Sequence, residues 1–346
     1  MRIAVTANLK KDTTASASPA ESGNSALFAG EKEEEFDSLQ TVQSIQRALE
    51  SAGHESFYLA ADRTLPFELQ RKKIDFVFNI AEGFSGRSRE AHVPALLEIN
   101  AVPFTGSDPL ALALTLDKSV AKFTALGAGV ATADFVVLHD GEIARTGKLP
   151  YPLFVKPCWE GSSKGIRASS KAENQTALEE EVTRLRTSFP GQPILVERYL
   201  GGREFTVGVL GNDLPRILGV MEIKSREGNK DFLYSIETKR NWRERIAYEC
   251  PPRQLKDTDK KFMEAMALRL FEVFGCRDLA RFDFRMNEGG KIYFLEANPL
   301  PGLNPESGDF VIMARLQGWT YEKLILGILE AAIKRERYRQ DDLRSS

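Results

Sequence analysis

The stretch from Arg281 to Gly302 constrains the fold of this chain more than any other. It holds two runs in which apolar and polar residues alternate, separated by the pair Gly289-Gly290. Such alternation is typical of strands with one buried face, and a glycine pair between two of them predicts a hairpin with a two-residue turn. We therefore expect two antiparallel strands here.

The two-residue turn predicts the register of this hairpin. Counted outward from the glycine pair, Asp283 faces Glu296 and Arg281 faces Asn298. Because successive side chains of a strand point to opposite faces, these four residues share one face. The residues on the other face are apolar and are expected to be core: Phe282, Phe284, Met286, Tyr293, Leu295 and Ala297.

Two carboxylates that face each other across a hairpin repel, so we expect a cation between them. Together with the carbonyl oxygen of Asn298, Asp283 and Glu296 make an all-oxygen ligand set. Such a set suits Mg²⁺ or Mn²⁺ and the phosphate oxygens that accompany these ions. The alternative is a charged surface that Arg281 and Arg285 neutralise.

Composition excludes several classes of function. Lys and Arg number 47 against 49 Asp and Glu, so no basic excess predicts nucleic-acid binding. The longest apolar runs, such as Ile74 to Ile80, are far shorter than the roughly 20 residues that a membrane helix needs. The three cysteines are widely spaced, which predicts neither disulfides nor a zinc site. The chain starts directly with a strand-like run, so we expect a cytoplasmic protein.

A second informative stretch runs from Lys156 to Gly165. Gly161 and Gly165 bracket two serines and a lysine. Backbone N–H groups, hydroxyls and an ammonium can therefore converge on an oxyanion, as in glycine-rich phosphate loops. The spacing matches neither the P-loop nor the dinucleotide fingerprint, and an ordinary polar hairpin is the alternative.

Three further segments carry weaker signals. The apolar run Ile74 to Ile80 is typical of a buried parallel strand. The charged loop Ala81 to Glu90 follows its carboxyl end, where ligands usually bind, although a solvated loop is equally consistent. We expect a mobile loop from Lys10 to Gly30 and a lid within the polar segment Ser225 to Arg245.

Six ordered motifs resemble the ATP-grasp superfamily and, within it, the D-alanine–D-alanine ligase family, over nearly the whole chain. They are Phe-Thr-Gly-Ser at 104–107, Leu-Asp-Lys at 116–118, Phe-Val-Lys-Pro-Cys-Trp-Glu-Gly-Ser-Ser-Lys-Gly at 154–165, Glu-Phe-Thr-Val-Gly at 204–208, Arg-Phe-Asp-Phe at 281–284 and Leu-Glu-Ala-Asn-Pro-Leu-Pro-Gly at 295–302. The resemblance implies an α/β (α+β) ATP-grasp fold. Its expected parts are an N-terminal parallel-sheet domain at 1–107, a central subdomain at 108–198 and a C-terminal subdomain with the metal site at 199–346.

The resemblance also implies ligands for ATP and two Mg²⁺ ions. The metal ligands would be Asp283, Glu296 and Asn298. Lys118 and Lys156 would contact the phosphates, with Lys239 at the γ-phosphate. Glu197 and the backbone through Leu200 would meet the adenine, and Glu204 would hold the ribose. The full set that would bind the nucleotide is Lys118, Lys156, Glu160, Ser162, Ser163, Glu197, Leu200, Glu204 and Lys239.

Four residues would serve the amino-acid chemistry. Arg281 and the backbone N–H of Gly302 are candidates to stabilise a tetrahedral oxyanion. Glu34 or Glu35 would anchor the first substrate's ammonium, in a hydrogen-bonded set with the loop residue Ser162.

The implied activity is ATP-dependent ligation of two amino acids through an acyl phosphate. The first product to expect is D-alanyl-D-alanine, for peptidoglycan synthesis. The resemblance also suggests a homodimer. Substrates other than D-alanine, namely other amino acids or a peptide amine, are one alternative, and a non-catalytic nucleotide-binding regulator is another.

The departures from the family lie in the part of the chain that would bind the amino acids. The usual His-Gly loop is Asn79-Ile80-Ala81-Glu82-Gly83, Arg240 replaces a tyrosine, and the segment around Ser307 is about two residues longer.

Overall fold

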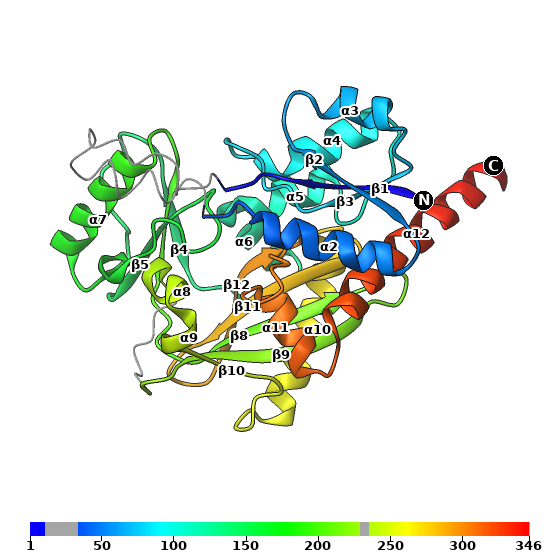
Figure 1. The fold of residues 1–346 in the computed structure, drawn as a ribbon. Coiled ribbons are helices and arrows are strands. Elements are labelled where there is room, and N and C mark those ends of the chain that lie inside the picture. The colour runs from blue at the N-terminus through cyan, green and yellow to red at the C-terminus, as the bar shows by residue number, and fades with distance from the viewer. Residues whose placement is uncertain (11–33, 229–234, 346) are drawn as a thin grey trace.

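The computed structural model describes residues 1–10, 34–228 and 235–345. Its strands form three sheets, around which the helices pack (Figure 1). Apart from Lys10, the segment predicted as a mobile loop lies outside the described residues, and so does the part of the predicted lid at 229–234.

The first sheet is parallel and has the order β2-β1-β3. Its strands are β1 (Arg2–Ala7), β2 (Glu55–Ala60) and β3 (Phe76–Asn79), and its helices are α2 (Leu39–Ser51), α3 (Leu65–Lys72) and α4 (His92–Ile99). The buried parallel strand predicted within 74–80 is therefore confirmed as β3. The loop after β3 leads through the short 3₁₀ turn η2 (Arg89–Ala91) into α4.

The second sheet is antiparallel and has the order β4-β7-β5-β6. Two helices, α5 (Pro109–Leu116) and α6 (Lys118–Gly127), precede it in the chain, and α7 (Gln175–Ser188) packs on it. The remaining elements are β4 (Phe135–Leu138), β5 (Leu153–Pro157), η3 (Ala168–Ser170), β6 (Lys171–Ala172) and β7 (Ile194–Arg198).

The third sheet is also antiparallel, with the order β10-β9-β8-β11-β12. Helix α10 packs on one face, and α11 packs on the other in a core shared with α12 and α2. The elements are β8 (Glu204–Leu210), β9 (Arg216–Ser225), α8 (Ile236–Arg240), α9 (Trp242–Arg245), β10 (Ile246–Glu249), α10 (Asp257–Val273), β11 (Leu279–Met286), β12 (Ile292–Asn298), α11 (Asp309–Leu316) and α12 (Tyr321–Ser345).

None of the helices in the described parts of the chain has the length and apolar character that crossing a membrane requires.

Strands β11 and β12 form the predicted hairpin, and Asp283 pairs with Glu296 as expected. The predicted two-residue turn is wrong. The N–H of Asn287 bonds to the carbonyl of Lys291, so the residues between them form a longer loop. This loop shifts the register near the turn, where Arg285 pairs with Tyr293, and a bulge after Asp283 restores the predicted pairs farther along.

The bulge also decides which residues of β12 are core. Ile292, Phe294 and Ala297 pack with the apolar residues of β11. The prediction that Tyr293 and Leu295 lie in this core is wrong, because Leu295 is the extra residue between the pairs on either side of the bulge. Leu295 instead lines the central cavity.

Candidate nucleotide and substrate site

One cavity is lined by residues from the N-terminal part of the chain and from the second and third sheets. Of the predicted site residues, Glu160 is not on its wall. The predicted residues that do line it are Glu34, Lys118, Lys156, Ser162, Ser163, Glu197, Leu200, Glu204, Lys239, Arg281, Asp283, Glu296, Asn298 and Gly302.

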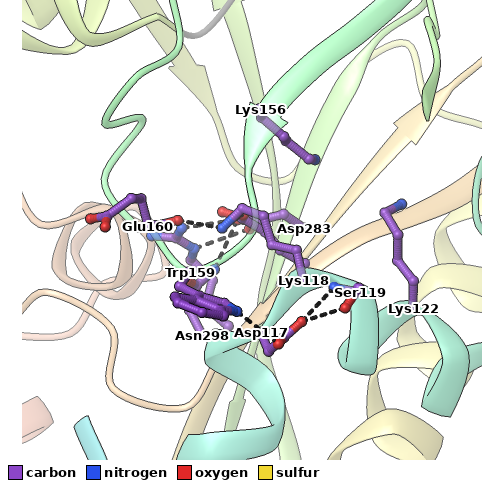
Figure 2. Close-up of polar contacts among 12 residues, drawn as sticks. Asp117, Lys118, Ser119, Lys122, Lys156, Trp159, Glu160, Asp283 and Asn298 are labelled. Atoms are coloured by element: carbon purple, nitrogen blue, oxygen red, sulfur yellow. Dashed lines mark hydrogen bonds and ion pairs between the residues drawn. The ribbon is translucent and has the colours of Figure 1, made fainter. Parts of the chain in front are cut away.

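Asp117 places the first lysine of this cavity. Its Oδ1 accepts the N–H groups of Ser119 and Val120, at 3.0 and 3.2 Å, which caps α6 so that the helix starts at Lys118. Its Oδ2 accepts the indole N–H of Trp159 at 2.9 Å (Figure 2). The Leu-Asp-Lys motif therefore begins a helix and also holds the loop that follows β5.

The Lys118 ammonium reaches two acceptors. It donates to the backbone carbonyl of Glu160 (Figure 2) and lies 3.2 Å from Oε2 of Glu296. Burial favours the neutral amine, but the Glu296 carboxylate outweighs burial and raises the pKa of Lys118. A predicted phosphate ligand therefore neutralises a predicted metal ligand.

Glu197, on the cavity wall, bridges two lysines. Its Oε2 lies 2.7 Å from Nζ of Lys122 and its Oε1 lies 2.6 Å from Nζ of Lys156. Burial opposes the ionisation of Glu197, but the two ammonium groups lower its pKa to about 2. Our sequence reasoning missed Lys122, although its position one helical turn after Lys118 places both lysines on one face of α6.

The hairpin face carries a second network. Nε and Nη2 of Arg281 lie 3.0 and 2.9 Å from the two carboxylate oxygens of Asp283. Nη1 of the same guanidinium lies 3.2 Å from Asp309 of α11, which sequence reasoning also missed. Asn298 donates its amide to Oδ2 of Asp283 at 3.1 Å. The four residues predicted to share a face do lie together.

The pKa values of the two facing carboxyl groups are shifted in opposite directions. Burial and the neighbouring Glu296 raise the pKa of Asp283 in spite of Arg281. Burial also opposes the ionisation of Glu296, but Lys118 and two other cations lower its pKa to about 2. Arg281 pairs with Asp283, as expected if this face were a charged surface neutralised by arginines. Glu296 pairs with Lys118 and not with Arg285.

The donor set on this wall fits a divalent ion. Carboxylate oxygens of Asp283 and Glu296 and the amide of Asn298 line one cavity, and hard oxygen donors suit Mg²⁺. Among the described residues, no three His, Cys, Asp or Glu side chains gather as a metal site. An ion held here would therefore complete its coordination with phosphate oxygens and water.

Arg285 occupies a different part of the same cavity. Its Nη1 lies 3.0 Å from Oε2 of Glu204, the predicted ribose ligand, and its guanidinium lies over the ring of Tyr199. Burial raises the pKa of Glu204 to about 7 even though Arg285 acts in the opposite direction. The base-and-ribose end of the predicted nucleotide site thus has a carboxyl group that titrates near neutrality.

The loop between β5 and β6 has two consecutive residues with left-handed backbone. Ser162 and Ser163 have φ values of 49° and 59°, in the left-handed region that few side chains adopt. Strained backbone of this kind concentrates at functional sites. The N–H of Gly161 and the ammonium of Lys164 converge on one anionic group, as the sequence predicted for this loop. That group is the carboxylate of Glu35.

The two described N-terminal glutamates have different partners. Oε2 of Glu34 lies 2.9 Å from Nη2 of Arg240, at the end of α8. Oε1 of Glu35 lies 2.7 Å from Nη2 of Arg89, in η2. The sequence predicted that either Glu34 or Glu35 anchors the substrate ammonium, and Arg240 pairs with Glu34.

The loop after β3 faces the cavity with two acids. Glu82 and Glu90 both line it, whereas residues 84–88 are exposed. Burial and neighbouring carboxylates raise the pKa of Glu82, and burial raises the pKa of Glu90 to about 7. The prediction that this loop contributes to a ligand site therefore has support at its two ends.

Comparison with known proteins identifies the family. A family model described as D-ala D-ala ligase C-terminus matches residues 123–330. The D-alanine–D-alanine ligase of Aquifex aeolicus is 33% identical over 302 residues, which cover 86% of this chain and 97% of that protein. A Sinorhizobium fredii protein described as uncharacterized protein y4sG is 34% identical over 303 residues, covering 85% of this chain and 88% of its own length.

The fold matches solved structures as well. A D-alanine–D-alanine ligase from Bacillus anthracis, crystallised with ATP, covers 98% of this chain and 99% of its own, with a TM-score of 0.74 at 21% identity. This likeness supports the mixed α/β ATP-grasp architecture. Together, the family model and the curated relatives show that this chain belongs to the D-alanine–D-alanine ligase family of ATP-grasp proteins.

Proposed function

We propose that this member of the family is an ATP-dependent carboxylate–amine ligase that joins two amino acids, with D-alanine and D-alanine as the first pair to test. Curated relatives named D-alanine–D-alanine ligase support this proposal. Such a ligase would act in the cytoplasm on small substrates and ATP.

One observation carries the proposal. Each carboxylate on the hairpin face is matched by a cation of the same cavity, Asp283 by Arg281 and Glu296 by Lys118. A site of this kind can exchange its internal ion pairs for Mg²⁺ and phosphate oxygens without leaving a buried charge unpaired. An ordinary solvated hairpin face would not need the buried lysine.

The first step of the proposed reaction is activation of a carboxylate. An oxygen of the first amino acid's carboxylate attacks the γ-phosphorus of ATP, the bond to the β-phosphate oxygen breaks, and ADP leaves. Lys118, Lys156 and Lys239 would hold the phosphates in line. Bound Mg²⁺, held by Asp283, Glu296 and Asn298, would neutralise the charge on the transferred group.

The second step is attack on the acyl phosphate. The free amine of the second amino acid adds to the acyl carbon, the tetrahedral oxyanion collapses, phosphate leaves and the nitrogen loses a proton. The Arg281 guanidinium and the backbone N–H of Gly302 are the donors that we assign to the oxyanion. Glu34 is the group that we assign to the first substrate's ammonium.

A second candidate uses the same mechanism on a basic amino acid or a peptide amine. Arg240 already neutralises Glu34, whereas Asp37, Glu82 and Glu90 also line the substrate end of the cavity. Burial raises the pKa of Asp37 to about 7 in spite of Lys10. A wall with this many carboxyl groups would favour a substrate with an additional positive charge.

Phosphate release from ATP separates the candidates. The full chain would be incubated with ATP, Mg²⁺ and a panel of D- and L-amino acids that includes basic ones, and products would be identified by mass spectrometry. Release with D-alanine alone supports D-alanyl-D-alanine synthesis. Release only with other pairs removes that product, and no release with any pair contradicts the ligase proposal.

A further inference from the structure

Glu35 makes a set of contacts different from those of its neighbour Glu34. Its side chain is 4% exposed and lies against the loop that carries Gly161 and Lys164. Its Oε1 accepts the Gly161 N–H at 2.7 Å, and its Oε2 lies 3.1 Å from the Lys164 ammonium. Both donors come from the sequence motif predicted to bind an oxyanion, and the chain itself supplies that oxyanion.

Arg89 strengthens the same contact from the N-terminal part of the chain. Its Nη2 lies 2.7 Å from Glu35, and its Nη1 donates to the backbone carbonyl of Trp159. Burial opposes the ionisation of Glu35, but Arg89 and Lys164 outweigh burial and lower the pKa of this carboxyl. One carboxylate and one guanidinium therefore hold the loop near both of its ends.

The lack of a side chain at Gly161 leaves room for this contact. A Cβ atom added to Gly161 would lie 2.6 Å from Oε1 of Glu35, closer than any van der Waals contact allows. The backbone of the loop can approach the carboxylate only because position 161 has no side chain. Since 126 positions separate the two residues, this contact forms only when the loop lies against the N-terminal part of the chain.

We propose that Glu35 is a positioning residue that latches the 159–165 loop over the nucleotide site, against the N-terminal part of the chain, an arrangement that we call the closed loop. This inference rests on the proposed function, because it takes the cavity beneath the loop as the phosphate site. Both glutamates line the cavity, and the inference assigns them separate tasks: Glu35 holds the loop, and Glu34 binds the substrate amine.

The latch predicts a cost for nucleotide binding when it is broken. If only a fraction of molecules has the closed loop, the apparent Kd rises by the inverse of that fraction. A fall from nearly complete closure to about one tenth would raise the Kd about tenfold.

Trypsin can report the loop directly, because Lys164 is a buried cleavage site within it. Glu35→Gln removes the charge of the latch, and Gly161→Ala displaces the carboxylate without changing any charge. Gly127→Ala is the matched control, because a Cβ there meets nothing within 4 Å. Cleavage after the exposed Arg253, whose side chain is 88% exposed, serves as the internal reference in every digest.

We expect cleavage after Lys164, relative to Arg253, to be at least about tenfold faster in both latch variants of the full chain, with the control at the wild-type rate. Wild-type rates in the two variants, or acceleration in only one, would overturn the latch. A magnesium complex of a non-hydrolysable ATP analogue is then titrated, and both variants should show the higher Kd. Failure of the wild-type chain to bind that complex would contradict the proposed function, whereas the protease result tests the latch independently.

Discussion

Arg240 and Glu34 form an ion pair, with 2.9 Å between Nη2 and Oε2, although 206 positions separate them in the sequence. The pair joins the end of α8 to the N-terminal segment beside the cavity. It places a guanidinium where the resembled family has a tyrosine, next to the carboxylate that we assign to a substrate amine. Several expectations about this protein follow from that charge and from the buried charges around it.

Arg240→Tyr should increase the affinity for the first amino acid. The substitution removes the counter-charge of Glu34, so its carboxylate is available to an ammonium. We expect the KM for the first amino acid to fall severalfold, measured by phosphate release at saturating ATP. The free energy of unfolding should change by less than about 1 kcal/mol, because Arg240 is 44% exposed and exposed ion pairs contribute little.

The control for this substitution is Arg243→Ala, which removes another exposed arginine of the same region, paired with Glu306. It should leave the KM unchanged. An unchanged or higher KM in the tyrosine variant would mean that Arg240 does not compete with the substrate.

Glu296→Gln should abolish most magnesium-dependent turnover. The amide keeps the size of the side chain but removes the charge that both Lys118 and a divalent ion would use. We expect turnover to fall by roughly 100-fold or more, as removal of a group that stabilises charge in an active site does, with unfolding still cooperative. Phosphate release measured across a Mg²⁺ titration checks this, with Glu249→Gln, a carboxylate outside the cavity, as control. Full activity in the Glu296 variant would refute the metal assignment.

Glu197→Gln should change how the free energy of unfolding depends on pH. The wild-type carboxyl has a pKa of about 2 in the folded chain against 4.5 as its ordinary value. Because the unfolded chain binds the proton first, this group stabilises the fold above pH 4.5 and loses that contribution as the pH falls toward 2. We expect the variant to be less stable near neutral pH by about 3 kcal/mol, because two buried lysines lose their partner.

Urea unfolding of both proteins between pH 3 and pH 7 measures this effect. The difference in the free energy of unfolding should narrow toward the acid end. A difference that stays constant over the whole range would show that Glu197 does not hold its low pKa.

Glu90→Gln should flatten the pH dependence of substrate binding. The pKa of Glu90 is about 7, chiefly because the carboxyl is buried, so it gains its negative charge as the pH rises through neutrality. A cationic substrate should therefore bind the wild type more tightly at pH 8 than at pH 6. We expect its KM to fall severalfold over this interval in the wild type and to fall less in the variant, in which Asp37 still titrates near pH 7. The exposed Glu98→Gln should behave as wild type, and an equal slope in all three proteins would exclude a role for Glu90.

Local sequence was sufficient for the parts of this site that depend on strand geometry. Side chains alternate along a strand whatever surrounds it, so the shared face of Arg281 and Asp283 followed from the alternation. The pairing of Asp283 with Glu296 was predicted from a two-residue turn that the structure does not have. Asp283 nevertheless pairs with Glu296, because the longer turn and the bulge shift the register in opposite directions. Core packing, not the local pattern, decided that Phe294 rather than Leu295 points inward.

The sequence by itself determined the motifs, the strand pair and the family to which they point. The tertiary structure decided which distant groups meet: Lys122 and Lys156 pair with Glu197, Arg240 pairs with Glu34, and the N–H of Gly161 donates to Glu35. The physical reason is that ion pairs and backbone contacts between distant segments leave no local period in a sequence. They exist only where the packing of three sheets brings their partners within a few ångströms and removes the water between them.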